Sequence, residues 1–412
     1  MVRPNILLLL IDCLRADALY GARRWAHTPT LDRLVRSGIA CTQAVASASS
    51  TTPCVASLLT GTYSFVHGIR SIFGLKLTPS VPSLVEVLRD RGYHTYAEVS
   101  GPLFPETGLD RGFDWYQCRE GSAYLSTAWG ADFRRRLRVG AFTPPWFLFL
   151  HLWELHHRRH ILPAFRSRTY GRNRYERALS SLDAELESLL AALPANTLII
   201  IHGDHGERIV ETDFRYRIYR LSRDLLGRRN TMKREGHEMD IYEDLIRVPL
   251  VFTLLSGDGP FPAGRQVPQL VRQIDVLPTL LDLLDLPVPP DIHGRSLKPA
   301  LLKDTPLHLE AYLEAFLRIR SDPRDRRVGW RTEEWKYIYA PQNPEIPEEL
   351  YFLPDDPQER RNLAARRPDV VAKYRGRIES LQQGPLAQNP GIVMSEEEQA
   401  SIAKRLTDLG YM

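Results

Sequence analysis

The chain has 412 residues, of which 43% are apolar, enough to bury a substantial core in one large domain plus a smaller one. Its formal net charge of only +4 does not indicate a nucleic-acid-binding protein. The 4 cysteines are too few for a disulfide framework, so we expect reduced thiols, and Cys41, Cys54 and Cys118 have no metal-type spacing.

Three continuous apolar runs predict strands that are covered on both faces of a sheet. The runs are residues 5–11, 146–150 and 197–203. Acidic or imidazole side chains follow each run: Asp12 after the first, His151, Glu154, His156 and His157 after the second, and Asp204, His205 and Glu207 after the third. Because ligands bind at the carboxyl ends of the strands in such folds, we expect these side chains to meet at one edge of the sheet.

Helical patterns alternate with these runs and with a fourth apolar run at residues 248–252. The helical patterns cover residues 30–37, 81–91, 173–193 and 275–285. This alternation predicts an α/β sandwich with a mostly parallel sheet. After about residue 305 the pattern changes to alternating segments at 308–316, 327–339 and 349–353, followed by helices near 366–383 and 396–408. We therefore predict a catalytic α/β domain at residues 1–304 and a C-terminal subdomain at 305–412.

Residues 50–61 (STTPCVASLLTG) predict a helix that begins beside a hydroxyl nucleophile. Pro53 fits the first helical turn, where its missing N–H costs nothing. The free N–H groups of that turn and the helix dipole favour an oxyanion beside Thr51. The alternative is that Thr51 or Thr52 is an ordinary N-cap. The pattern indicates a phosphate or sulfate site.

Short motifs follow one another in a fixed order along the whole chain. They are Arg3–Asn5 with Leu14–Asp17, Thr28–Leu34, Ser57–Gly61 with His67–Gly68, Asp204–Glu207, Gly236–His237 with Tyr242–Glu243 and Ile246–Leu250, Asp275–Leu280, Gly294–Leu297, Asn362–Leu363 and Leu409–Met412. In this order they resemble the sulfatase family within the alkaline phosphatase superfamily. The resemblance implies an alkaline-phosphatase-like fold with a small C-terminal antiparallel sheet and a helix.

The chain departs from sulfatases proper at the nucleophile. Those enzymes carry Cys or Ser two residues before the proline and Arg two residues after it, and the Cys or Ser is oxidised to formylglycine. Here the two positions are Thr51 and Val55, and Cys54 lies on the wrong side of Pro53. Threonine cannot give the formylglycine aldehyde, so none is expected. The chain resembles the threonine branch of the superfamily, which includes phosphodiesterases, phosphonate hydrolases and phosphoglycerol or phosphoethanolamine transferases.

The resemblance also implies a metal site and a covalent mechanism. One divalent cation held by Asp12, Asp204 and His205 is expected to bind the Thr51 oxygen, which then attacks in line and forms a threonyl ester. Oxygen ligands suit Mg, Mn or Ca, while imidazole also accepts Zn, so the metal stays open. Cys13 stands where many members have a second aspartate. It is either a small buried side chain or a soft ligand.

Two histidines match family positions that face the nucleophile. His156 and His237 are the candidates for protonating the leaving oxygen or gripping the transferred group, and we favour His156 as the acid. Glu154-Leu155-His156 stands where the family usually has Asp-Pro-His. Residues 208–235, rich in arginine and tyrosine, are longer than the loop of many relatives. We predict a lid or substrate-facing excursion there, with a peripheral surface helix as the alternative.

We therefore predict a metal-dependent hydrolase of phosphate diesters or phosphonate esters. The alternatives are a phosphoryl-group transferase, a sulfuric ester hydrolase and a non-catalytic binding relative. The expected partner is an anionic phospho- or sulfo-ester. The first apolar run is followed at once by charged residues, which indicates a core strand and not a signal peptide, and no run has the ~18 apolar residues of a membrane span. Cytoplasmic residence is the resulting expectation. The oligomeric state is not predicted.

Overall fold

The computed structural model describes residues 3–21, 24–156, 159–209, 236–237, 239–257, 261–316, 323–387 and 391–409. Most of the predicted excursion, residues 210–235, lies outside the described residues, as do His157 and the last three residues of the closing motif. All statements below concern the described part of the chain.

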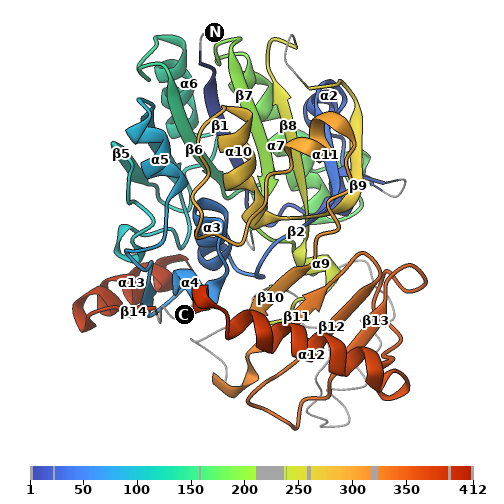
Figure 1. Cartoon of the computed structure of the whole chain (residues 1–412). Helices are drawn as coiled ribbons and strands as arrows, with labels where there is room; N and C mark the ends of the chain where they lie inside the picture. The colour runs from blue at the N-terminus through green and yellow to red at the C-terminus, as the bar shows by residue number, and fades with distance from the viewer. Residues whose placement is uncertain are drawn as a thin grey trace.

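The centre of the molecule is an eight-stranded sheet in the order β5-β4-β6-β1-β7-β8-β2-β9 (Figure 1). Its strands are β1 (Asn5–Ile11), β2 (Ile39–Val45), β4 (His94–Val99), β5 (Trp115–Cys118), β6 (Trp146–Leu152), β7 (Thr197–Gly203), β8 (Arg247–Leu254) and β9 (Arg265–Arg272). Strand β8 is antiparallel to both its neighbours, and the other pairings are parallel. The predicted mostly parallel sheet is confirmed.

Helices cover both faces of this sheet, which explains the uninterrupted apolar run of β1. Leu8 of β1 packs in one cluster with side chains of α3, α5, α10 and α11, while Leu9 packs in the opposite cluster with α2, α6 and α7. These helices are α2 (Pro29–Ser37), α3 (Thr51–Thr60), α5 (Leu84–Asp90), α6 (Ala128–Arg138), α7 (Arg174–Leu190), α10 (Val276–Leu283) and α11 (Lys298–Lys303). Successive residues of a strand point to opposite faces, so every residue of β1 is buried.

The C-terminal part forms a second, smaller sheet of four antiparallel strands. They are β10 (Ala311–Ala315), β11 (Arg327–Arg331), β12 (Trp335–Tyr339) and β13 (Glu349–Phe352), in sequence order. Helix α12 (Pro368–Gln382) lies along this sheet (Figure 1). The antiparallel sheet and helix implied by the resemblance are confirmed, while the boundary at residues 304 and 305 stays a prediction.

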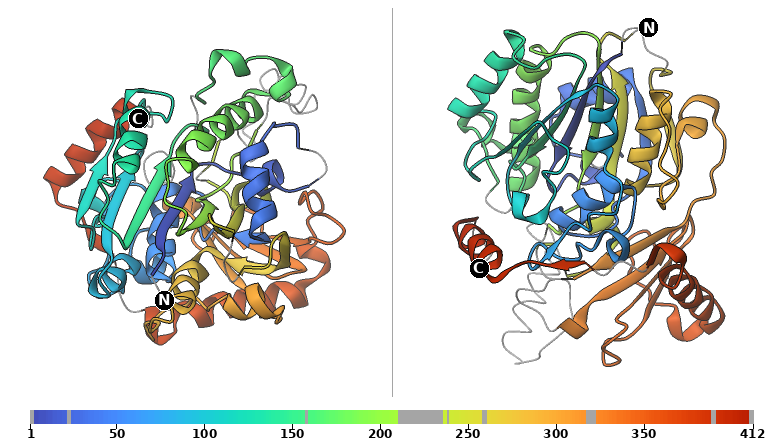
Figure 2. Two further views of the ribbon diagram at one scale, coloured as in Figure 1. Left: turned by 90° about the horizontal axis from the view of Figure 1, so that it is seen from above. Right: turned by 60° about the vertical axis from the view of Figure 1, so that its left-hand side comes forward.

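The chain after α12 returns to the large sheet. Strand β14 (Ile392–Val393) pairs with β3 (Leu75–Lys76), and helix α13 (Glu396–Leu409) packs near β5 (Figure 2). Short helices α1 (Ala16–Leu19), α4 (Ser64–His67) and α9 (Glu243–Ile246) complete the connections, with α9 between the two sheets. Within the described ranges, no helix combines the length and the apolar character needed to cross a membrane.

Candidate active site

Neighbouring parallel strands bring the predicted acidic residues to one edge of the large sheet. In β1 and β7, Ile11 lies opposite Gly203, so Asp12 and Asp204 leave the two strands at the same level. Strand β2 runs in the same direction as β7, because each is antiparallel to β8. Its carboxyl end therefore leads to the start of α3 at this edge, where Thr51 is the first helical residue.

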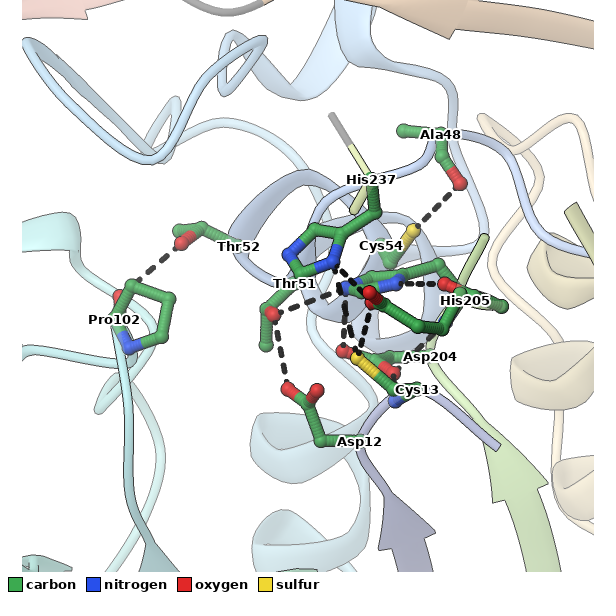
Figure 3. Close-up of polar contacts among 12 residues, drawn as sticks. Asp12, Cys13, Ala48, Thr51, Thr52, Cys54, Pro102, Asp204, His205 and His237 are labelled. Carbon is green, nitrogen blue, oxygen red and sulfur yellow. Dashed lines mark hydrogen bonds and ion pairs between the residues drawn. The ribbon is translucent and has the colours of Figure 1, made fainter. Parts of the chain in front are cut away.

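Thr51 and Thr52 differ in what their hydroxyl groups contact (Figure 3). The Thr51 hydroxyl donates to Asp12 Oδ2 at 3.1 Å and its Oγ1 lies 3.3 Å from His205 Nε2. The Thr52 hydroxyl instead donates to the carbonyl oxygen of Pro102 at 3.1 Å. No side chain caps the first turn of α3, so neither threonine acts as an N-cap. Of the two, Thr51 is the one that faces the acidic residues.

The side-chain atoms of His205, Asp204 and Asp12 that lie near Thr51 are mainly hydrogen-bond acceptors. His205 Nδ1 donates to the carbonyl of Gly206 at 2.8 Å, so its Nε2 carries the lone pair that faces Thr51. Asp204 Oδ1 accepts the backbone N–H groups of Cys13 and His205 at 3.1 and 2.8 Å. Asp12 Oδ1 and Asp204 Oδ2 are buried without a hydrogen-bond partner among the described residues.

Such a set of converging acceptors fits a divalent cation. Donor atoms of Asp12, Asp204 and His205 all lie within 4.8 Å of one another, and all three residues are fully buried. Burial raises the pKa of the Asp204 carboxyl, and the charge of Asp12 raises it further. Burial also acts to raise the pKa of Asp12, but contacts with the neighbouring imidazoles outweigh it and lower that pKa. A cation at this position would relieve the repulsion between the two carboxylates.

His237 belongs to a second group of side chains beside the first. Its Nδ1 lies 2.7 Å from Glu207 Oε2, and the thiol of Cys13 lies 3.4 Å from the same oxygen. Burial acts to raise the pKa of Glu207, but the charge of His237 dominates and lowers it to about 2. Burial and the charge of Asp12 raise the pKa of the Cys13 thiol well above its usual range. His237 thus lies beside His205, with ring centroids 4.3 Å apart, and is held by Glu207, while its catalytic role stays a prediction.

His156 lies beside His237 and is almost completely buried. Its ring stacks on Trp153 with centroids 3.8 Å apart, and the centroid of His237 is 5.3 Å away. Burial lowers the pKa of His156 to about 3, so the free protein holds it as a neutral imidazole at pH 7. Glu154 Oε1 accepts the backbone N–H of Leu125 at 2.8 Å. The role of His156 as the acid stays a prediction.

Sequence reasoning left His151 and Glu207 without a role, although both follow from strand ends. His151 Nε2 lies 3.4 Å from Asp12 Oδ2, and its Nδ1 lies 3.1 Å from the carbonyl oxygen of Ser100. His151 pairs in register with Leu10, two residues before Asp12, and this register is the signal that identifies it. Glu207 comes three residues after Asp204, and nothing in the sequence shows that His237, across the excursion, is its partner.

Only the first two residues of the predicted excursion, Arg208 and Ile209, are described. The Arg208 guanidinium contacts Asp244 at 3.0 Å and Asp240 at 3.4 Å. It is therefore committed to two carboxylates of the protein. The lid function of residues 210–235 stays a prediction, because these residues lie outside the described part of the chain.

Comparison with known proteins finds a family for this chain. The family model described as Sulfatase matches residues 4–286, and the model for the C-terminal region of N-sulphoglucosamine sulphohydrolase matches residues 238–384. Arylsulfatase K of Homo sapiens is 28% identical over 220 residues, 50% of this chain and 36% of that protein. The delta 4,5-hexuronate-2-O-sulfatase of Bacteroides thetaiotaomicron is 26% identical over 305 residues, 70% of this chain and 52% of that protein. The matched region spans only about a third to a half of these relatives.

Solved structures share the fold across nearly the whole chain. A protein solved in complex with its substrate D-glucosamine-2-N,6-O-disulfate has a TM-score of 0.71 at 19% identity, covering 94% of this chain and 100% of its own. The phosphonate monoester hydrolase of Agrobacterium radiobacter has a TM-score of 0.69 at 20% identity, covering 92% and 95%. At these identities the likeness shows the fold alone. Because the Sulfatase model matches well over half of its residues, this chain belongs to the sulfatase family of the alkaline phosphatase superfamily.

Proposed function

We propose that this chain hydrolyses phosphate diesters or phosphonate esters in the threonine branch of its superfamily, with Thr51 as the nucleophile. The observation that carries the proposal is the position of Thr51 Oγ1, which is 3.1 Å from Asp12 Oδ2 and 3.3 Å from His205 Nε2. The thiol of Cys54, the nearest cysteine in sequence, donates to the carbonyl of Ala48 at 3.2 Å. No formylglycine is part of this proposal, since Thr51 occupies the position at which sulfatases form it.

The residues of the chain divide the reaction between them. The Thr51 hydroxyl already donates to Asp12 Oδ2, so its proton has an acceptor while Oγ1 forms a bond to phosphorus and the bond to the leaving oxygen breaks. The free N–H groups of the first turn of α3 are available to the oxygens of the transferred group. The imidazolium of His237, whose Nδ1 lies 2.7 Å from Glu207 Oε2, supplies the proton that the leaving oxygen takes up. His156 is neutral in the free protein, so it would take this role only after the bound anionic ester has favoured its protonated form. Water then attacks phosphorus while the bond from phosphorus to Thr51 Oγ1 breaks; Asp12 returns the proton to Oγ1, and the proton of the water passes to the imidazole left neutral by the first step.

Members of this family typically bind a divalent metal, and the donor set fits one. Asp12, Asp204 and His205 would hold it beside Thr51. When bound, it lowers the pKa of the nucleophile and neutralises charge on the oxygens of the substrate. Mg, Mn, Ca and Zn all suit the carboxylate and imidazole donors.

Phosphorus is favoured over sulfur because of how the covalent ester must break. A formylglycine hemiacetal can expel sulfate by elimination, since it keeps a second hydroxyl on the same carbon. The Thr51 ester has no such hydroxyl, so water must cleave it at the central atom of the transferred group. A threonyl sulfate would therefore accumulate as a trapped form, whereas a threonyl phosphate or phosphonate is open to in-line attack.

Sulfate ester hydrolysis is the second candidate, and a specific observation favours it. The curated relatives that match this chain include arylsulfatase K and the delta 4,5-hexuronate-2-O-sulfatase, both named for sulfate esters. Transfer to an alcohol in place of water is a further alternative that shares the first chemical step.

Matched kinetics test the proposal. The purified protein, loaded in turn with each candidate metal, is given a phosphate diester, a phosphonate ester and a sulfate ester of one aryl leaving group. We expect kcat/KM for the phosphorus esters to exceed that for the sulfate ester, with activity lost in Thr51→Ala. Faster turnover of the sulfate ester would return the chain to the sulfate-specific enzymes. Addition of glycerol or ethanolamine distinguishes transfer from hydrolysis, because a transferase gives the alcohol product.

A further inference from the structure

Three potential metal ligands meet beside the Asp12 site without being part of it. Cys13 Sγ lies 3.4 Å from Glu207 Oε2 and 3.9 Å from His237 Nδ1, and the last two atoms are 2.7 Å apart. Cys13 follows β1, Glu207 follows β7, and His237 precedes α9, so three separate segments contribute one donor each. Cys13 is fully buried, and the side chains of His237 and Glu207 are 8% and 4% exposed.

The backbone at Cys13 is held in a strained conformation that separates its side chain from that of Asp12. Its φ of 59° lies in the left-handed region, which costs a non-glycine residue roughly 1–2 kcal/mol. Hydrogen bonds fix this conformation, since the N–H of Cys13 donates to Asp204 Oδ1 at 3.1 Å and its carbonyl accepts the Tyr175 hydroxyl at 2.9 Å. As a result, Asp12 faces Thr51 while the thiol of Cys13 faces His237 (Figure 3). The same thiol also contacts Glu207 Oε2. Strain of this kind is characteristic of functional positions.

Two of the three donor-to-donor distances are close to those of tetrahedral coordination of zinc. Bonds of ~2.3 Å to sulfur and ~2.0–2.2 Å to nitrogen or oxygen place neighbouring ligands roughly 3.3–3.7 Å apart. The distances from Cys13 Sγ to Glu207 Oε2 and His237 Nδ1, 3.4 and 3.9 Å, are within a few tenths of an ångström of this range. The 2.7 Å contact between Glu207 and His237 is a hydrogen bond that must open as its proton leaves.

This set is distinct from the first because one imidazole nitrogen cannot bind two ions. Donor atoms of Cys13, His205 and His237 also lie within 4.8 Å of one another. However, Nδ1 of His205 is bonded to the carbonyl of Gly206, and its Nε2 faces Thr51. The first ion would use that nitrogen together with carboxylate oxygens, so a second ion depends on Cys13, Glu207 and His237.

We propose that Cys13, Glu207 and His237 form a second cation site, specific for a thiophilic ion such as Zn²⁺, next to the oxygen-rich site of Asp12, Asp204 and His205. Three protein ligands leave a fourth position open, as in zinc sites that accept water or an anion. Sulfur selects zinc over magnesium and calcium, so the two adjacent sites differ in the metals they take. Binding releases the thiol proton and the proton shared by His237 and Glu207 to solvent. The proposal concerns binding and does not depend on which ester the protein cleaves.

Cobalt spectroscopy and metal counting test this second site without any measurement of turnover. The full-length protein is stripped of metal with a chelator in the presence of a phosphine reductant, and is then titrated with Co²⁺ or Zn²⁺. We expect two zinc ions per chain and a near-ultraviolet sulfur-to-cobalt charge-transfer band. Cys13→Ser should lose the band and bind one zinc ion. The matched control is Cys118→Ser, which changes the partly buried thiol at the end of β5. This variant should keep both the band and the second ion.

A second variant keeps the test decisive if Cys13→Ser fails to fold. His237→Ala retains the thiol but loses a ligand, so we expect its affinity for the second ion to fall at least about tenfold. Unchanged affinity in His237→Ala would overturn the proposal. A single zinc ion per wild-type chain would overturn the proposal as well. If the charge-transfer band is absent, the Cys13 thiol binds no metal; if the band is present, the thiol is a ligand of the first ion.

Discussion

Two buried clusters of charged side chains differ in whether the protein supplies a partner of opposite charge for each group. Between the two sheets, Glu243 contacts Arg331 and Lys336 at 3.3 Å each, and Lys336 also contacts Glu359 at 2.9 Å. At the edge of the large sheet, Asp12 and Asp204 each keep a carboxylate oxygen without a hydrogen-bond partner among the described residues. In the first cluster each charged group lies within 3.3 Å of a protein group of opposite charge. The second has carboxylate oxygens that a bound cation would neutralise, and we propose it as the functional one.

Removing the nucleophile should affect only the functional cluster. We expect Thr51→Ala to lower kcat roughly 10⁴-fold or more, because a methyl group cannot attack, while the unfolding midpoint stays near that of the wild type. Steady-state kinetics and a denaturant titration measure the two effects. Thr52→Ala is the matched control, since its hydroxyl is bonded to the Pro102 carbonyl and should be dispensable for chemistry. If Thr52→Ala were inactive and Thr51→Ala kept a tenth of the activity, Thr52 and not Thr51 would be the nucleophile.

Breaking the ion-pair cluster of Glu243, Arg331, Lys336 and Glu359 should lower stability and leave catalysis unchanged. Lys336 is fully buried, and Lys336→Met leaves Glu243 and Glu359 without the ammonium group between them. We expect a loss of about 3–5 kcal/mol in the free energy of unfolding, with kcat of the folded fraction unchanged. Urea denaturation at pH 7 measures the loss. The control is Lys76→Met, which breaks a partly exposed pair with Glu398 and should cost no more than about 1 kcal/mol. Equal losses in the two variants would show that the buried cluster of Lys336 contributes no more to stability than the partly exposed pair of Lys76 with Glu398.

A second satisfied carboxylate predicts the acid limb of stability. Glu314 accepts hydrogen bonds from Ser64 and Tyr312 at 2.6 Å each and contacts Arg70 at 2.7 Å. Burial acts to raise its pKa, but the charges of Arg70 and Arg326 outweigh that effect and lower it from 4.5 to about 2. The group therefore stabilises the fold above its unfolded pKa, and this contribution is lost as pH falls from about 5 to 2. On the order of 3 kcal/mol is involved.

Glu314→Gln tests this sign directly. The variant should be less stable than the wild type at pH 7, and the difference should shrink toward pH 2. Chemical denaturation at several pH values follows the two curves. Parallel curves for the two proteins between pH 5 and 2 would contradict the assignment.

Chelation should destabilise the functional cluster by a smaller amount. At a metal concentration a hundred times Kd, removal of the ion costs about 2.7 kcal/mol, seen as a lower Tm. In the metal-free state Asp204→Asn should be at least as stable as the wild type, because the amide oxygen can keep both backbone N–H groups and the repulsion with Asp12 is gone. In the metal-loaded state the same variant should lose the stabilisation. A wild-type Tm that is insensitive to exhaustive chelation would show that these residues hold no cation.

How far the sequence predicts the fold depends on how completely each element is buried. Strand β1 was predicted from residues 5–11 and has those limits, because a strand covered on both faces must be apolar throughout. Strands β2 and β4 were not predicted. Their sequences, IACTQAV and HTYAEV, mix small and polar residues, and they are specified by pairing with distant strands.

The same reason limits what the sequence shows of the site. The positions of Asp12, Thr51 and Asp204 followed from strand ends and a helix start, which are local signals. The contact between Glu207 and His237 joins residues that are 30 positions apart, and no local pattern encodes it. The left-handed backbone of Cys13 is likewise a product of its hydrogen bonds to Asp204 and Tyr175, not of its residue type.

The most direct test of Thr51 as the nucleophile is to identify the covalent intermediate. The metal-loaded protein is mixed with an aryl phosphodiester or phosphonate ester, quenched in acid within the first turnover, digested and examined by tandem mass spectrometry. We predict a phosphoryl- or phosphonyl-group adduct on the Thr51 hydroxyl, absent from Thr51→Ala and present in Thr52→Ala. An adduct on any other side chain, or full turnover by Thr51→Ala with no adduct at all, would contradict the account.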